Sequence, residues 1–129
     1  MRDRILAVDD DPAQLELVDL LLKEEGFAVD TAADGIEALQ KVQRSRPDLI
    51  VLDASMPRMN GFTFCEKVRQ DAATARIPII MVTGLRNDFS RLNGFAHGAN
   101  AYLAKPYVAA ELLAKINELL AAARTGKGG

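Results

Sequence analysis

The sequence predicts an α/β fold in which a doubly wound, five-stranded parallel sheet carries helices on both faces. Five short segments of strand character alternate with stretches of helical periodicity along the 129 residues. Four of these segments are continuously apolar, which is typical of strands buried on both faces. Because strands and helices alternate at about 20–25 residues per unit, right-handed crossovers and a parallel sheet are expected.

The strands are predicted at the five segments themselves. The segment at 27–31 alternates between apolar and polar residues, which indicates a less buried strand at a sheet edge. The four continuous segments lie at 5–8, 49–52, 79–82 and 101–103.

Helices are predicted between the strands, because apolar residues recur there at helical spacing. The pattern is weaker in the stretch that contains Phe89, Leu92 and Ala96. It is clear at Leu15-Val18-Leu22, Ile36-Leu39-Val42, Phe62-Cys65-Val68 and Leu112-Ile116-Leu119. Phe62 and Phe64 cannot both face the core from one helix, so the environment of Phe64 stays open.

Residues that favour helix ends agree with this assignment. Asp11 suits the N-cap of the first helix, with Pro12 at its first position and Gln14 placed for a capping-box bond back to the cap. Gly26 can end that helix, and Pro47 ends the second.

Composition predicts one domain with no general attraction to nucleic acid or membranes. Lys and Arg number 16 against 18 Asp and Glu, a formal net charge of -2, so there is no basic field. Neither a secretion signal nor a membrane span is expected, because the chain has no suitable apolar segment. The lone Cys65 favours a reducing, cytoplasmic compartment. The domain is expected over residues 1–122, with 123–129 as a flexible tail or truncated linker.

Polar residues gather where the predicted strands end. Asp9 and Asp10 follow the first strand, Asp53 the third, Thr83 the fourth, and Lys105 comes after the fifth. Ligands of open parallel sheets bind outside these carboxyl ends. If the first and third strands are neighbours, roughly 4.8 Å apart, the three acids share one small pocket and raise one another's pKa. Mg²⁺ relieves such repulsion and prefers oxygen ligands, so the cluster predicts a metal site.

The acids also have a simpler interpretation, since Asp often caps helices. Asp11 is assigned to that role. Capping is a weak explanation for Asp53, because Met56-Pro57 and Asn60-Gly61 delay the next helix. For Lys105 the corresponding alternative is a surface salt bridge, although its place at a strand end favours a functional role.

Four motifs in chain order carry a family resemblance. They are the acidic pair Asp9-Asp10, LDASMPRMNG at 52–61, Thr83 followed by a small residue, and ANAYLAKP at 99–106. With them the chain resembles the receiver domain of two-component response regulators, from Ile5 to about Leu120. The resemblance implies a flavodoxin-like strand order 2-1-3-4-5 and a cis bond before Pro106.

The resemblance also implies roles for the acids. Asp53 would accept a phosphoryl group from a histidine kinase or a phosphotransfer protein. Mg²⁺ would bind Asp10 and Asp53, with Asp9 assisting through water and the Ser55 main-chain carbonyl as a further ligand. The physical chemistry agrees, because a carboxylate can act as a nucleophile and phosphoryl transfer mainly requires positioning and charge neutralisation.

Thr83 and Lys105 are implied to contact the phosphoryl oxygens. In the family, an aromatic residue at the place of Tyr102 changes rotamer together with the Thr. This remodels the face built by the fourth helix, fifth strand and fifth helix, which would act on a downstream protein or output domain. Without the resemblance, Tyr102 is an aromatic residue at a sheet edge with its hydroxyl in water. In the family, the positions of Ser55 and Leu85 flank the line of water attack on the phosphoryl group. Leu85 cannot hydrogen-bond a water, so the resemblance predicts slow self-dephosphorylation.

Two other functions fit the same fold. A Mg²⁺-dependent phosphohydrolase also forms an aspartyl phosphate, but such enzymes usually carry a second acid where this chain has Ser55. A flavodoxin-type binding module shares the strand order, but three acids would oppose the phosphate of a flavin. The sequence therefore favours a phosphoryl-accepting regulatory domain that is not an enzyme.

Overall fold

The computed structural model describes residues 2–54, 59–84 and 98–124. Its strands form one parallel sheet in the order β2-β1-β3-β4-β5, which confirms the predicted topology. The strands are β1 (Arg4–Val8), β2 (Ala28–Ala32), β3 (Leu49–Asp53), β4 (Ile79–Thr83) and β5 (Ala101–Ala104). The helices are α1 (Pro12–Glu24), α2 (Gly35–Ser45), α3 (Gly61–Gln70) and α5 (Ala109–Arg124). The predicted helix around Phe89, and Leu85, lie outside the described residues.

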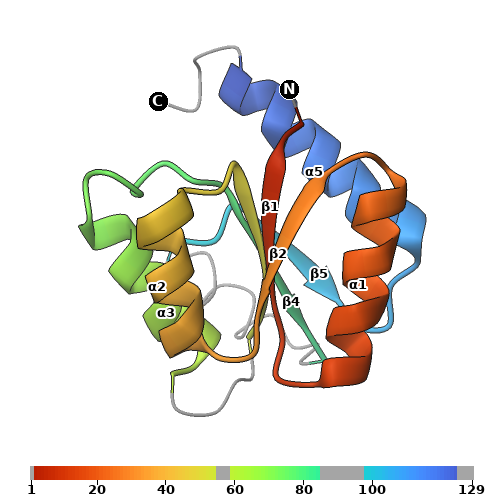
Figure 1. Cartoon of the computed structure of the whole chain (residues 1–129), viewed down its shortest axis with the longest axis horizontal. Coiled ribbons are helices and arrows are strands. Elements are labelled where there is room, and N and C mark those ends of the chain that lie inside the picture. Colours follow the sequence, from red (N-terminus) through yellow and green to blue (C-terminus); the bar gives the residue numbers. More distant parts are fainter. Residues whose placement is uncertain (1, 55–58, 85–97, 125–129) are drawn as a thin grey trace.

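Helices cover both faces of the sheet (Figure 1). Helices α2 and α3 pack on one face, over a cluster that includes Leu6 and Phe64. Helices α1 and α5 pack on the other face, where Leu22 and Ile116 contact a second cluster that includes Ile5. Successive residues of a strand point to opposite faces, so Ile5 and Leu6 enter different clusters. Both faces of the sheet are buried, which is why the strand segments are continuously apolar.

The strands end at the polar residues of the predicted site. β3 includes Asp53, β4 includes Thr83 and β5 includes Ala104, each one residue beyond the predicted end. β2 is shifted by one residue from the prediction, because the amide of Phe27 donates to the carbonyl of Leu22 (3.1 Å) and completes the turn after α1. Asp53 and Thr83 are therefore held by the sheet itself rather than by loops.

The predicted ends of α1 are confirmed. Asp11 is its N-cap, and the Asp11 carboxylate accepts a hydrogen bond from the amide of Ala13 (3.0 Å). Gly26 follows the helix with a φ of 95°, a conformation that favours glycine. The predicted return bond from Gln14 is replaced by a different contact, since the Asp11 amide donates to Asp9 Oδ1 at 3.0 Å.

The core face of α3 includes the predicted Cys65 and Val68 but differs from the prediction at Phe62. Gly61, Phe64, Cys65 and Val68 are buried, whereas Phe62 is only half-buried. The buried set follows the spacing i, i+3, i+4, i+7 of one complete apolar stripe. The predicted stripe shares Cys65 and Val68 with this face, whereas Phe62 lies at its margin and packs partly against the core. Phe64, whose environment the sequence left open, is fully buried in the core.

The position of Cys65 predicts an unreactive thiol in the folded protein. The side chain is fully buried, and burial raises the pKa of the thiol to about 12. Because the thiolate is the reactive form, we expect a disulfide reagent such as DTNB to label Cys65 only as fast as the protein unfolds. Labelling should be fast in denaturing urea. Labelling of the native protein at the rate of free glutathione would contradict this.

The last helix runs past the predicted end of the domain at residue 122. α5 continues to Arg124, whose guanidinium pairs with Asp3 at the start of the chain. The domain boundary itself stays a prediction, and the predicted tail at 125–129 lies outside the described residues. Among the helices that the structure describes, none is both long and apolar enough to cross a bilayer.

Candidate functional site

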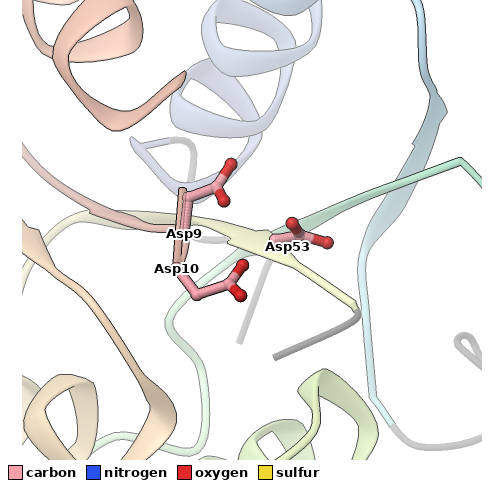
Figure 2. A group of neighbouring side chains, drawn as sticks. All are labelled: Asp9, Asp10 and Asp53. Carbon is pink, nitrogen blue, oxygen red and sulfur yellow. The ribbon is translucent and has the colours of Figure 1, made fainter. Parts of the chain in front are cut away.

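The carboxyl edge of the sheet brings three predicted site residues together. β1 and β3 are neighbours, with Val8 opposite Leu52, so Asp9 lies beside Asp53. Carboxylate oxygens of Asp9, Asp10 and Asp53 all lie within 4.8 Å of one another, and Figure 2 shows the three side chains grouped at this edge. We call these three residues the acid cluster. The structure thus assembles the acids as the expected strand order requires.

The acids differ in how firmly they are held. The amide of Asp9 donates to the carbonyl of Ala32 (3.2 Å), and its side chain accepts the amide of Asp11 (3.0 Å). Asp53 is the last residue of β3, and only 11% of its side chain is exposed. Asp10 is exposed to solvent. The cluster therefore combines two restrained carboxylates with one that faces solvent.

Burial disfavours the ionised form of Asp9 in the acid cluster. The pKa of Asp9 is raised above its ordinary value, chiefly because burial penalises the carboxylate. The hydrogen bond from the Asp11 amide opposes this shift, whereas the charge of Asp53 adds to it. A positive charge among these oxygens would stabilise the ionised forms.

Lys105 supplies one such charge from the end of β5. Its Nζ lies 3.3 Å from Asp53 Oδ2 and 3.7 Å from Asp9 Oδ2. Its amide donates to the carbonyl of Thr83 (2.8 Å), and the bond to Pro106 is cis, as the resemblance implies. Burial alone would lower the pKa of Lys105, but the two carboxylates outweigh burial and the pKa is raised. The ammonium group therefore remains charged and faces the acid cluster.

Thr83 and Tyr102 lie on the adjoining strands β4 and β5. Thr83 ends β4 and is buried. Tyr102 lies opposite Met81 of β4; the residue is 8% exposed and its hydroxyl oxygen is buried. The alternative interpretation, in which the Tyr102 hydroxyl lies in water, is therefore wrong. A coupled rotamer change of Thr83 and Tyr102 stays a prediction.

One predicted ligand cannot be placed, and one pocket residue was missed. Ser55, whose carbonyl is implied as a metal ligand, lies outside the described residues. Tyr107 lines the same pocket as Asp9, Asp53 and Lys105. Burial raises the pKa of its hydroxyl. Its position two residues after Lys105 was the only signal in the sequence that could have indicated this contact.

Comparison with known proteins points to one family. A family model described as the response regulator receiver domain matches residues 5–117. The DNA-binding dual master transcriptional regulator RpaA of Synechocystis is 43% identical over 117 residues, which cover 91% of this chain and 48% of RpaA. The chain spans about half or less of the length of the curated relatives that it matches.

Solved structures agree with this match. A putative response regulator from Chloroflexus aurantiacus shares 38% identity and a TM-score of 0.90, over 94% of this chain and 99% of that chain. The receiver domain of the sensor histidine kinase PA1611 from Pseudomonas aeruginosa shares 31% identity and a TM-score of 0.87, over 94% and 99% of the two chains. That structure has a magnesium ion coordinated in the active site cleft.

The matches do not favour the phosphohydrolase or the flavodoxin-type alternative. Receiver domains are regulatory domains that bind Mg²⁺ at an acidic pocket and interact with histidine kinases and output domains. The acid cluster and Lys105 lie where such a pocket is expected, at the carboxyl edge of the sheet. The chain therefore belongs to the response regulator receiver domain family, whose members are phosphoryl-accepting signalling switches of two-component systems.

Proposed function

We propose that Asp53 is the phosphoryl acceptor of this chain and that the acid cluster binds Mg²⁺. Lys105 and Thr83 contact the phosphoryl oxygens in this proposal. The observation that supports it most directly is the convergence of three carboxylates within 4.8 Å, with an ammonium group 3.3 Å from the carboxylate of Asp53. A nucleophile, an ammonium group and a set of oxygen ligands for a cation therefore lie together at one edge of the sheet.

The proposed reaction is a transfer between two side chains. A carboxylate oxygen of Asp53 attacks the phosphorus of a phosphohistidine, the phosphorus–nitrogen bond breaks, and the imidazole leaves with the electron pair. The phosphorus–oxygen bond of an aspartyl phosphate forms at the same time. Lys105 is placed to neutralise the negative charge that the phosphoryl group brings, because its Nζ already pairs with the acceptor carboxylate. Thr83 serves as a hydroxyl donor from the end of β4.

The donor set fits Mg²⁺. The three side chains offer only oxygen ligands, and their mutual repulsion is what a small divalent cation relieves. Asp10 and Asp53 would ligate the ion, Asp9 would assist through water, and the Ser55 carbonyl would complete the protein ligands. When bound, the ion supplies charge stabilisation to the phosphoryl oxygens.

The proposal also covers how phosphorylation would change the binding of a partner. Thr83 moves toward the phosphoryl group, Tyr102 takes a new rotamer, and the face formed by the fourth helix, β5 and α5 changes its partner affinity. The donor is a histidine kinase or a phosphotransfer protein, and the recipient is a downstream protein or an output domain. Charged hydrogen bonds to phosphate, each worth about 1.5–3 kcal/mol, are sufficient to shift a two-state element.

The domain is proposed to span residues 1–122 and to work in the cytoplasm. The single cysteine, a buried thiol, is compatible with a reducing compartment. Self-phosphorylation from a small donor and slow self-dephosphorylation are the only reactions proposed for the chain alone.

The proposal is tested with acetyl phosphate as a small-molecule donor. With Mg²⁺ present, we expect the intact mass of the chain to rise by one phosphoryl group, and hydroxylamine to remove that group as it does from acyl phosphates. With excess EDTA the gain should disappear. A chain that gains no phosphoryl group under either condition, or that gains one unaffected by EDTA, would overturn the proposal.

Replacing Lys105 with Met should tighten Mg²⁺ binding even though it slows phosphorylation. The ammonium group and the metal ion compete for the same carboxylates, so removing a unit charge at this distance should favour the ion by about 1 kcal/mol, or ~5-fold. Isothermal titration with MgCl₂ measures the change. Lys23→Met is the matched control, because Lys23 pairs with Asp19 on the exposed face of α1. Weaker binding by the Lys105 variant would contradict the assignment of the metal site.

A further inference from the structure

Arg69 of α3 makes a dense set of contacts away from the acid cluster. Its guanidinium donates five hydrogen bonds, with distances between 2.6 and 3.1 Å. The acceptors are the carbonyls of Ala75, Ile77 and Gly98 and the side chain of Asn100. These oxygens are neutral, so the contacts orient the guanidinium without pairing its charge. Because the half-buried guanidinium donates along all its sides, these contacts hold the four acceptor residues in place. We call Arg69 and its four acceptor residues the Arg69 network.

Asn100 connects the Arg69 network to the sheet. The main-chain amide of Asn100 donates to the carbonyl of Ile79 (2.8 Å), and the side-chain Oδ1 of Asn100 accepts the main-chain amide of Ile79 (2.9 Å). The same Oδ1 accepts a bond of 2.6 Å from Arg69. The next pair along the strands is Ile80 opposite Ala101. Asn100 therefore begins the hydrogen-bond ladder between β4 and β5, and Arg69 fixes the side chain that begins it.

The register of β5 matters because β5 is an edge strand. In the described part of the sheet it pairs with β4 alone, over four residue pairs. A slip of one residue would displace Lys105 by roughly 3.3 Å and turn Tyr102 to the other face. Lys105 Nζ is 3.3 Å from Asp53 Oδ2, so such a slip would break this contact.

Helix α3 connects the Arg69 network to β3, the strand that carries the proposed phosphoryl acceptor Asp53. At its first residue, the amide of Gly61 donates to the carbonyl of Ala54 (2.9 Å), next to Asp53. A Cβ on Gly61 would lie 2.8 Å from Ala54 Cα, so the helix begins in close contact with the end of β3. Near its last residue, Arg69 holds Gly98 and Asn100. The helix thus links the end of β3 to the start of β5.

We propose that Arg69 is a positioning residue for phosphoryl transfer. By fixing Asn100 and Gly98 it sets the register of β5 against β4, and the register sets the distance between Lys105 and Asp53. This inference rests on the proposed role of Lys105 at the acceptor. If it is correct, the reaction depends also on a residue of α3 that lies near the start of β5, at the end of the strands opposite the acid cluster.

A double-mutant cycle separates positioning from a loss of stability. The initial rate of phosphorylation by acetyl phosphate is measured at saturating Mg²⁺ in the chain, in Arg69→Met, in Lys105→Met and in the double variant. We expect Arg69→Met to slow the reaction by ~10-fold or more, as misplaced catalytic groups do. In the Lys105→Met background the same change should alter the rate by less than ~2-fold, because the group that Arg69 positions is absent. Equal slowing in both backgrounds would overturn the proposal.

Further variants guard against misfolding. Asn100→Asp keeps the acceptor oxygen for Ile79 and Arg69 and should retain the original rate, whereas Asn100→Ala should slow it. Lys67→Met, an exposed change on the same helix, is the matched control and should have no effect. If Asn100→Ala reacts at the original rate, the proposal is wrong.

Hydrogen exchange tests the register without any phosphorylation. The amides of Asn100 and Lys105 donate to the carbonyls of Ile79 and Thr83, at the two ends of the β4–β5 ladder. Arg69→Met should speed the exchange of both amides relative to those of β1, and unchanged exchange would overturn the inference. If the parent chain is not phosphorylated at all, the proposed function fails, and this exchange result still decides whether Arg69 sets the register.

Discussion

Replacing Asp53 with Asn abolishes phosphoryl incorporation from acetyl phosphate. The amide that results has no nucleophilic oxygen anion, so the attack on phosphorus is lost, and one ligand charge of the acid cluster is lost as well. We expect the intact mass in the presence of Mg²⁺ to remain that of the unmodified chain. The effect should be a complete loss rather than a slower rate, because the other described carboxylate that pairs with Lys105, that of Asp9, already accepts the Asp11 amide and is proposed only to assist the metal ion through water.

The control for this result is Asp11→Asn. It removes an acid from the same edge of the sheet but preserves the N-cap of α1, since Asn caps helices about as well as Asp. This variant should be phosphorylated like the parent chain. Full incorporation into the Asp53→Asn variant, with circular dichroism confirming that it is folded, would show that the acceptor is another residue.

Replacing Phe64 with Ala should lower the free energy of unfolding by about 3–5 kcal/mol. The ring is fully buried between α3 and the sheet, in the cluster that also contains Leu6 and Val68. Its removal costs the transfer free energy of the ring and leaves a cavity, because the surrounding side chains relax only partly. A single domain is commonly stable by about 5–15 kcal/mol, so the change takes a large share of the total. Urea unfolding followed by circular dichroism measures it.

Phe62→Ala provides the comparison within the same helix. Phe62 is half-buried at the margin of the core, and its truncation should cost about 1 kcal/mol. The midpoint in urea should shift much further for Phe64→Ala than for Phe62→Ala, with similar slopes. Equal shifts, or a larger one for Phe62→Ala, would mean that α3 presents the face predicted from sequence rather than the face seen in the structure.

Much of the acid site follows from local patterns. Continuous apolar segments locate the strands, and the polar residues directly after them must lie at the carboxyl edge of a parallel sheet. Asp9, Asp53 and Thr83 are therefore placed by their distance from a strand end. The adjacency of β1 and β3, on which the grouping of Asp9 with Asp53 depends, entered with the resemblance to receiver domains and is present in the structure.

The misassigned face of α3 shows the limit of such patterns. Helical periodicity is satisfied about equally well by Phe62-Cys65-Val68 and by Phe64-Cys65-Val68, because the two sets share Cys65 and Val68 and differ only in which ring flanks them. Only the direction from which the sheet and α2 approach the helix decides which ring is buried. That direction depends on residues far away in the chain.

By itself, the sequence determined the order of strands and helices along the chain, the residue types at the strand ends and the oxygen-rich chemistry of the acid cluster. These depend on local periodicity and on residue identity, which can be determined for each segment of the sequence separately. Only the tertiary structure decided that Lys105 reaches Asp53, that the Tyr102 hydroxyl is buried, and that Arg69 holds the start of β5. Each of these is a contact between residues distant in the chain, and its geometry is set by how the helices pack on the sheet.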